Sequence, residues 1–141
     1  MYYLIYVSSA TREMSNEELA EILDTARKEN AKASITGMLL YKEGNFMQML
    51  EGEKERVLDL YEKIKKDPRH KDVITVIERE APKRTFPDWT MGFHNMQQIK
   101  GNPNFNDYIS INLIPERFLG DARFAHSFIS SFNQTDDQLT S

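Results

Sequence analysis

The sequence predicts an α+β fold of the ferredoxin-like kind, a β-α-β-β-α-β-β order that forms one sheet with two helices on one face. Five short runs of branched, aromatic and other apolar residues alternate with two apolar stripes at helical spacing. This alternation ends near residue 97, where the composition becomes rich in Asn, Gly and Pro. We therefore expect a compact domain over residues 1–97 and a C-terminal helical extension over residues 98–141.

The first element is a strand over residues 2–8, which is apolar on both faces and therefore suits the interior of a sheet. Ser15 and Glu18 then have the spacing of a capping box, which marks the start of a helix. Its apolar stripe consists of Leu19, Ile22, Leu23 and Ala26. We expect this helix to end near Lys28, with Asn30 in a capping role because Asn tolerates a left-handed backbone.

Two apolar runs at residues 35–41 and 46–50 flank a polar turn that contains Gly44, and this pattern predicts a β-hairpin. Right-handed crossovers would seat the second hairpin strand beside the first strand of the chain. Tyr6 and Gln48 are then potential neighbours on adjacent strands.

A second helical stripe follows the hairpin and consists of Val57, Leu60, Tyr61 and Ile64. Residues 67–70 end this helix, and further strands are expected over residues 73–78 and 89–96. Beyond a linker at residues 101–107, Asp121 can cap a helix, and we expect residues 133–141 to be frayed. The apolar stripe of that helix is Phe124, Phe128 and Phe132. We expect this stripe to cover the helix-free face of the sheet, with a subunit interface as the alternative.

The bulk composition excludes several classes of function. The 141 residues carry a net charge of −4, which gives no basic excess for binding nucleic acid. The absence of cysteine excludes disulfides and thiolate metal sites, and the three histidines are too scattered to suggest a metal centre. The N-terminal apolar run is too short for a signal peptide or membrane helix, so we expect a cytoplasmic protein without membrane contact.

Two polar residues fall inside predicted strands and require partners. Strand alternation places Gln48 on the same face as Phe46 and Leu50, where an unpartnered amide would cost about 1–3 kcal/mol. Tyr6 lies in an interior strand and needs a partner for its hydroxyl. Ordinary bonds to backbone or neighbouring groups would satisfy both, so neither residue alone indicates function.

Five segments in order resemble the BLUF family of flavin-based blue-light sensors over about residues 1–97. They are Leu-Ile-Tyr-Val-Ser at residues 4–8, Asn30 ahead of Ile-Thr-Gly-Met-Leu at 35–39, Gly-Asn-Phe-Met-Gln-Met-Leu-Glu-Gly at 44–52, Asp-Pro-Arg-His at 67–70, and Phe-Pro-Asp-Trp-Thr-Met at 86–91. The resemblance implies a non-covalent FAD held between the two helices. The residues it implies for cofactor binding are Tyr6, Ile22, Asn30, Gln48, Lys63, Ile64, Asp67, Arg69 and His70.

The same resemblance implies a mechanism that does not consume substrate. Tyr6 gives an electron and a proton to the excited flavin, and Gln48 then rearranges its hydrogen bonds to the flavin, which produces a red-shifted signalling state. Trp89 or Met91 packs near Gln48 and is implied to relay the change. We expect a photoreceptor rather than an enzyme, one that forms a homo-oligomer or contacts a separate signalling protein. Glu29 and Ala26 depart from some relatives and would alter flavin contacts or the rate of dark recovery.

Two other readings use the same fold. An acylphosphatase-like hydrolase would need a phosphate-binding loop after the first strand; Arg12 and nearby hydroxyls are present there, but no glycine is. A light-insensitive regulatory domain would have lost the flavin, and the presence of Tyr6, Asn30 and Gln48 together argues against this reading.

Overall fold

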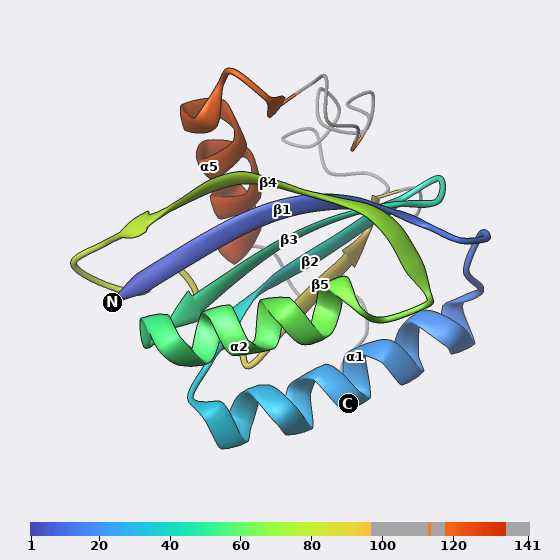
Figure 1. Ribbon diagram of the computed structural model, residues 1–141, viewed down its shortest axis with the longest axis horizontal. Helices are drawn as coiled ribbons and strands as arrows, with labels where there is room; N and C mark the ends of the chain where they lie inside the picture. Colours follow the sequence, from blue (N-terminus) through green and yellow to red (C-terminus); the bar gives the residue numbers. More distant parts are fainter. Residues whose placement is uncertain (97–112, 114–117, 135–141) are drawn as a thin grey trace.

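The computed structural model of the chain describes residues 1–96, 113 and 118–134 (Figure 1). Within this part, the first half of the fold comprises β1 (Tyr2–Ala10), α1 (Asn16–Ala33), β2 (Thr36–Lys42) and β3 (Asn45–Gly52). The second half comprises α2 (Lys54–Lys65), β4 (His70–Glu80), β5 (Gly92–Asn95), α5 (Ala122–Ser130) and a 3-10 turn at Ser131–Gln134. The predicted element order and the ferredoxin-like α+β class are confirmed.

The strands form one mixed sheet in the order β4-β1-β3-β2-β5. β1 pairs antiparallel with both β3 and β4, so the N-terminal strand is interior, as its two apolar faces predict. The β1–β3 register places Tyr6 directly opposite Gln48, and the β2–β3 register places Leu39 on the other side of Gln48. The predicted neighbourhood of Tyr6 and Gln48 is therefore confirmed.

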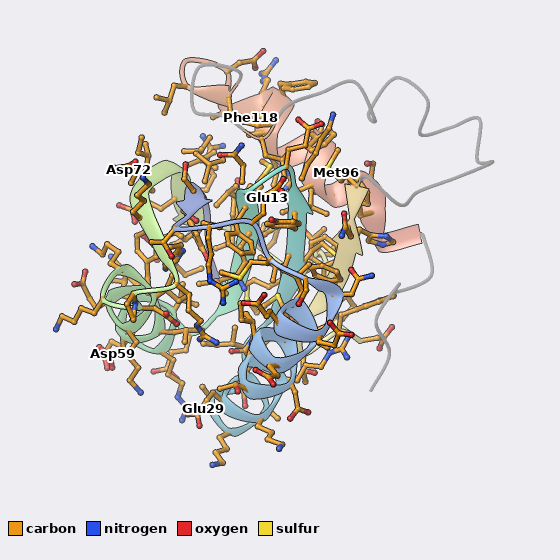
Figure 2. The ribbon with its side chains drawn as sticks, turned by 90° about the vertical axis from the view of Figure 1, so that its right-hand side faces the viewer. Glu13, Glu29, Asp59, Asp72, Met96 and Phe118 are labelled. Carbon is orange, nitrogen blue, oxygen red and sulfur yellow. The ribbon has the colours of Figure 1, made fainter. Side chains whose placement is uncertain are left out.

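Helices cover both faces of the sheet. α1 and α2 lie on one face, over a core that includes Leu4, Leu23 and Val57 (Figure 1). α5 covers the other face, where Phe128 and Ile129 are buried in the same cluster as Ile5, Met47 and Met49. Figure 2 shows Glu29 and Asp59, on the two N-terminal helices, on the opposite side of the sheet from Phe118. The expectation that the Phe124, Phe128 and Phe132 stripe covers the helix-free face is confirmed.

The first helix is longer than predicted. Its N-terminus has the predicted capping box, with Ser15 and Glu18 bonded reciprocally, but the helix continues past Lys28 to Ala33. Ser34, with φ 56° and ψ 38°, is the left-handed cap. The capping role predicted for Asn30 is therefore wrong. Asn30 is buried on the inward face of the helix, in line with Leu19 and Leu23.

The fifth strand is shorter than the predicted span of residues 89–96 and begins only at Gly92. The residues before it are held by hydrogen bonds that do not belong to a strand ladder, including one from the Asn30 side chain to the Thr90 carbonyl. At the C-terminal end, Asp121 caps α5 through the Phe124 amide, as predicted. The 3-10 turn includes Asn133 and Gln134, so those two residues are not frayed. The predicted linker and residues 135–141 lie outside the described residues.

Candidate functional site

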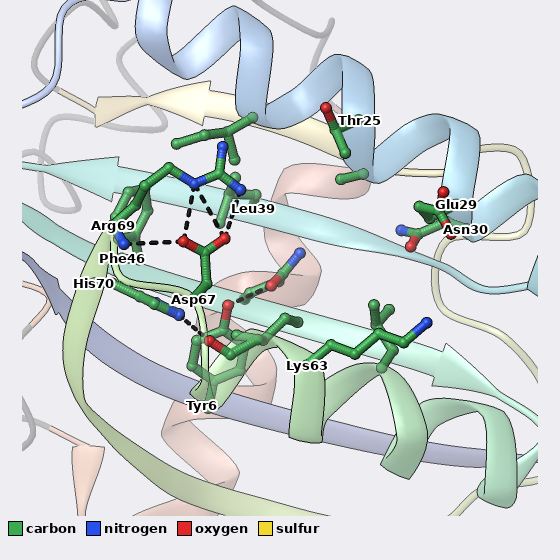
Figure 3. Close-up of a pocket in the computed structure, with 15 residues that line it drawn as sticks. Tyr6, Thr25, Glu29, Asn30, Leu39, Phe46, Lys63, Asp67, Arg69 and His70 are labelled. Atoms are coloured by element: carbon green, nitrogen blue, oxygen red, sulfur yellow. Dashed lines mark hydrogen bonds and ion pairs between the residues drawn. The ribbon is translucent and has the colours of Figure 1, made fainter.

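A cavity of about 210 Å³ lies between α1, α2 and the sheet, and the start of β4 closes one end of it (Figure 3). Aliphatic side chains form its sides, and polar groups converge on it from the sheet and from the segment after α2. All nine residues predicted to contact a cofactor line this one cavity: Tyr6, Ile22, Asn30, Gln48, Lys63, Ile64, Asp67, Arg69 and His70. The structure thus brings together residues from three strands, two helices and a loop.

Four other lining residues had no predicted role in cofactor binding: Thr25, Leu39, Phe46 and Leu60. Ala26 and Glu29, the two departures from relatives that were expected to alter flavin contacts, also line the cavity. Periodicity could have identified several of them. Leu60 lies one helical turn before Ile64, and Phe46 lies on the same strand face as Gln48. Leu39 depends on the pairing of β2 with β3, which the sequence pattern does not specify residue by residue.

The centre of the sheet contributes a pair of polar side chains to the cavity wall. The Tyr6 hydroxyl donates a hydrogen bond to Gln48 Oε1, and both residues are buried. The other end of the same amide, Nε2, lies 3.3 Å from the Met91 sulfur. Gln48 is therefore engaged at both ends, as a buried amide requires. Because an amide has a donor end and an acceptor end, it can connect Tyr6 to a ligand in the cavity.

Burial keeps Tyr6 protonated. It raises the pKa of the Tyr6 phenol well above the usual value near 10, and the neighbouring Tyr61 and Asp67 raise this pKa further. The rings of Tyr6 and Tyr61 are 5.3 Å apart, and the Tyr61 hydroxyl is 2.7 Å from Thr75 Oγ1. Of the two adjacent tyrosines, Tyr6 is bonded to an amide on the cavity wall, whereas Tyr61 is bonded to a hydroxyl on β4.

Asn30 offers an unused acceptor at the cavity. Its Nδ2 donates to the Thr90 carbonyl at 2.8 Å, but its Oδ1 is buried and has no hydrogen-bond partner among the described residues. An acceptor in that state is costly unless a ligand supplies a donor. The imide N–H of a flavin ring is a donor of this kind, so the chemistry of the site fits a flavin.

Charged residues gather at the opposite end of the cavity. Arg69 donates to both carboxylate oxygens of Asp67, from Nε to Oδ1 at 3.0 Å and from Nη2 to Oδ2 at 2.5 Å (Figure 3). These bonds are the main reason that the pKa of Asp67 is lowered. Lys63 also lines the cavity, but its side chain extends away from Arg69, towards the side of the cavity where Asn30 lies (Figure 3). Because the guanidinium of Arg69 is paired with the Asp67 carboxylate, an anionic part of a ligand at this end would share it with that carboxylate.

His70 lies at this end of the cavity and is hydrogen-bonded to groups on α2 and β1. Its Nε2 is bonded to the Ile64 carbonyl, and its Nδ1 is 3.0 Å from Ser8 Oγ. A carbonyl oxygen only accepts, so the Nε2–H group donates to the Ile64 carbonyl. The His70 ring also meets the Tyr6 ring edge-on, at 6.3 Å between centroids.

The structure places the two candidate relay residues on different sides of the sheet. Met91 is buried with Tyr6 and Phe93 in the cluster under α1 and α2. Trp89 packs against the cluster on the α5 side, which includes Met38. In this structure, therefore, Met91 is the residue that adjoins Gln48.

The described part of the chain contains neither a candidate metal-binding group nor a helix that could cross a membrane. Across residues 1–96, 113 and 118–134, no three His, Asp or Glu side chains are grouped so as to hold a metal ion. In the same part of the chain, no helix combines the length and apolar character needed to cross a membrane.

Comparison with known sequences gives a family and several relatives. A family model described as sensors of blue-light using FAD matches residues 1–92. The photoactivated adenylate cyclase subunit beta of Euglena longa is 44% identical over 108 residues, which cover 76% of this chain and 13% of that protein. The subunit beta of Euglena gracilis is 43% identical over the same length. The chain thus spans a small fraction of the curated relatives that it matches.

Solved structures show the same similarity across nearly the whole chain. BlsA in its photo-activated state is 26% identical, with a TM-score of 0.80 and coverage of 99% of both chains. The dark-state structure of BlrB, a BLUF protein, is 25% identical, with a TM-score of 0.75 and coverage of 92% of this chain and 95% of that chain. A bacterial light-regulated adenylyl cyclase is 29% identical, with a TM-score of 0.75, and this chain covers 41% of it.

Proposed function

Because the chain belongs to the BLUF family, the sensors of blue light using FAD, we propose that it is a photoreceptor in which Tyr6 and Gln48 respond to light absorbed by a non-covalent FAD. The single observation that carries this proposal is the Tyr6–Gln48 hydrogen bond on the wall of the cavity. It supports the proposal because it joins an oxidisable phenol to an amide that has both a donor end and an acceptor end.

Bound FAD supplies the absorption of blue light and accepts an electron when excited. Ile22 on α1 and Ile64 on α2 would contact its flat ring from two sides, and Asn30 Oδ1 would accept from its imide N–H. Arg69 and His70 would lie near its ribityl and phosphate part, and Lys63 would approach the flavin. Ligand pockets usually measure about 300–1,000 Å³, whereas this cavity measures about 210 Å³. We therefore place the ring inside the cavity and the rest of the dinucleotide at its charged end.

Tyr6 is the electron donor in this proposal. Its phenol is protonated in the dark because burial raises its pKa. When Tyr6 loses an electron its proton becomes strongly acidic, and the hydrogen bond to Gln48 Oε1 offers that proton a route. The Tyr61 hydroxyl is instead paired with Thr75 Oγ1, away from the amide on the cavity wall. This difference supports Tyr6 over its neighbour as donor.

Gln48 is the switch. Rotation of its amide would exchange the groups that face Tyr6 and Met91, whereas a tautomeric change would leave both atoms in place and make Oε1 a donor. Rotation would remove the Nε2–Sδ contact to Met91, and Met91 would then be the first residue outside the cavity to respond. We assign a relay role to Met91, with Trp89 as a secondary participant through the segment that they share.

We propose that the protein signals by contacting another protein subunit rather than by catalysing a reaction. The chain would act as a cytoplasmic homo-oligomer or through a separate signalling protein, with residues 1–97 as the sensor and residues 98–141 as the extension. The match of BlsA over 99% of its length supports this arrangement. The relatives whose names include adenylate cyclase contain far more sequence than this chain covers.

The hydrolase alternative is not supported at the loop after β1. The Arg12 guanidinium is bonded to both oxygens of the Glu18 carboxylate, so it is engaged within the start of α1. A phosphate bound there would have to compete with that pair. The light-insensitive alternative would leave the Asn30 acceptor buried and unsatisfied, a costly feature for a domain without a ligand.

The colour and photochemistry of the purified protein test the proposal. The protein should be yellow, its flavin absorption bands should shift to the red under blue light, and the shift should reverse in darkness. A colourless preparation that also fails to take up added FAD would contradict flavin binding. A yellow preparation without a reversible shift would instead favour the light-insensitive domain.

A further inference from the structure

Three successive backbone carbonyls just before β5 are each held by a donor from another element. The Trp89 carbonyl accepts from the Gly37 amide at 3.0 Å. The Thr90 carbonyl accepts from Asn30 Nδ2 at 2.8 Å, and the Met91 carbonyl accepts from Arg27 Nε at 2.9 Å. Two of the three donors are side chains of α1, so this helix holds the segment directly.

Arg27 donates a hydrogen bond to the backbone of Met91, the residue that contacts Gln48. The Met91 backbone is held by Arg27, while the Met91 sulfur lies 3.3 Å from Gln48 Nε2. Arg27 itself does not line the cavity, unlike Asn30. Its effect on the cavity would therefore pass through the position of Met91.

The Met91 side chain is buried, with 1% of its surface exposed, and its methyl group lies near Gly37 of β2. A Cβ added at Gly37 would lie 3.3 Å from the Met91 methyl carbon and 1.9 Å from the Met49 carbonyl oxygen. β2 thus passes close to Met91 on one side, and Arg27 fixes its backbone on another. A side chain confined in this way depends on its backbone anchor for its position.

We propose that Arg27 is a positioning residue that holds Met91 against Gln48 in the dark state and so sets the lifetime of the light-induced state. This inference rests on the proposed photoreceptor function. The Arg27–Met91 hydrogen bond is present in the same arrangement in which Gln48 Nε2 contacts the Met91 sulfur. Loss of the bond removes stabilisation from the dark state and from the path back to it, so dark recovery becomes slower.

Two substitutions separate the hydrogen bond from the charge. Arg27→Gln places an amide nitrogen at the same number of bonds from Cα as Arg Nε, so it keeps a donor without the charge. Arg27→Leu removes the donor and the charge together. Lys28→Leu is the matched control, because Lys28 is exposed on the same helix and pairs only with Asp24 at 3.1 Å among the described residues.

The first measurement is the rate at which the red-shifted absorption decays in darkness. We expect Arg27→Leu to slow recovery about fivefold or more, which corresponds to about 1 kcal/mol in the barrier. Arg27→Gln and Lys28→Leu should remain within about twofold of wild type. If Arg27→Leu recovers as fast as Lys28→Leu, the inference is overturned. It is also overturned if Arg27→Gln slows recovery as much as Arg27→Leu, because loss of the charge alone would then explain the slowing.

The second measurement does not depend on light. In the dark protein with Met ε-methyl groups labelled with ¹³C, the Met91 resonance is assigned by Met91→Leu. Arg27→Leu should shift or broaden this resonance, and Arg27→Gln should largely restore it. An unchanged Met91 resonance in Arg27→Leu would refute the positioning role. If wild type shows no photocycle, the proposed function fails, while the methyl spectrum still decides whether Arg27 positions Met91.

Discussion

The Tyr6 hydroxyl donates its hydrogen bond to Gln48 Oε1 between two residues that are directly opposite each other on β1 and β3. Because the pair is fixed by strand register, neither side chain needs a loop to bring it into place. The remaining end of the amide lies against Met91. The dark arrangement is therefore a chain from phenol to amide to thioether, and each link can be removed separately.

Tyr6→Phe should keep the yellow colour and abolish the red shift. The substitution removes only the hydroxyl, so the cavity keeps its shape, but the phenol proton and its route to Gln48 are lost. We expect less than about a tenth of the wild-type shift, measured as light-minus-dark absorption. The buried Gln48 oxygen loses its donor, which should lower the free energy of unfolding by about 1–3 kcal/mol.

Tyr61→Phe is the matched control for this prediction. It removes a hydroxyl from a ring 5.3 Å from that of Tyr6, but from a bond to Thr75 rather than to Gln48. Its photocycle should be retained with the full shift. A normal, stable shift in Tyr6→Phe, or its loss in Tyr61→Phe alone, would reverse the assignment of the donor.

Gln48→Leu should bind FAD and fail to form the normal light-induced state. Leucine fills a similar space but carries neither a donor nor an acceptor, so Tyr6 loses its partner and Met91 its contact. Light-minus-dark spectra should lack the reversible red shift, while the flavin content after purification stays near that of wild type. A wild-type photocycle in this variant would exclude Gln48 as the switch.

Alkaline pH should destabilise the protein through its buried tyrosines. Burial is the main cause of the raised pKa values of Tyr2, Tyr3, Tyr6 and Tyr61. A raised folded-state pKa gives stability that is fully present below the unfolded value near 10. This stability is lost as the pH rises above that value, because the unfolded chain then releases protons that the folded chain retains.

The contribution of Tyr6 can be measured by comparison with Tyr6→Phe. Between pH 10 and 11, urea unfolding of wild type should lose up to about 1.4 kcal/mol per pH unit more than that of Tyr6→Phe, for one retained proton. The two proteins should show parallel pH profiles between pH 7 and 9. Parallel slopes above pH 10 would mean that Tyr6 ionises normally in the folded state.

Residues that are neighbours because their strands are adjacent could be predicted from the sequence. Contacts between a helix and a distant loop could not. Tyr6 and Gln48 were placed together because right-handed crossovers leave few strand orders. Asn30 was predicted as a cap because its left-handed preference is local. Ala31 and Ala33 are good helix formers and carry the helix past it, and the partner of Asn30 is Thr90, 60 residues away.

The positions of Trp89 and Met91 also lay beyond sequence reasoning. A regular strand would place these two residues on the same face, since side chains alternate with a period of two. The segment is not a strand, because side chains of α1 hold the Thr90 and Met91 carbonyls. Trp89 and Met91 therefore join clusters on opposite sides of the sheet.

Asn30→Ala should weaken FAD binding by about tenfold to a hundredfold. The substitution removes an acceptor at the cavity, a loss of about 1–3 kcal/mol when a buried donor is left unpaired. It also frees the Thr90 carbonyl. Titration of the flavin-free protein with FAD, followed by flavin fluorescence, measures the effect. Lys32→Ala, an exposed change on the same helix, should bind FAD as wild type does. Equal affinity of the two variants would show that Asn30 does not contact the flavin.

Phe128→Ala should destabilise the folded chain by about 3–5 kcal/mol, because Phe128 is 1% exposed and lies between α5 and the sheet. Leu119→Ala is the control, since Leu119 is 48% exposed and its loss should change stability by no more than about 0.5 kcal/mol. Urea unfolding at two protein concentrations measures both effects. If α5 stabilises its own sheet, the difference between the variants will not depend on protein concentration. A difference that shrinks on dilution would show instead that Phe128 stabilises a contact between subunits, because dilution removes that stabilisation from the protein that retains the contact.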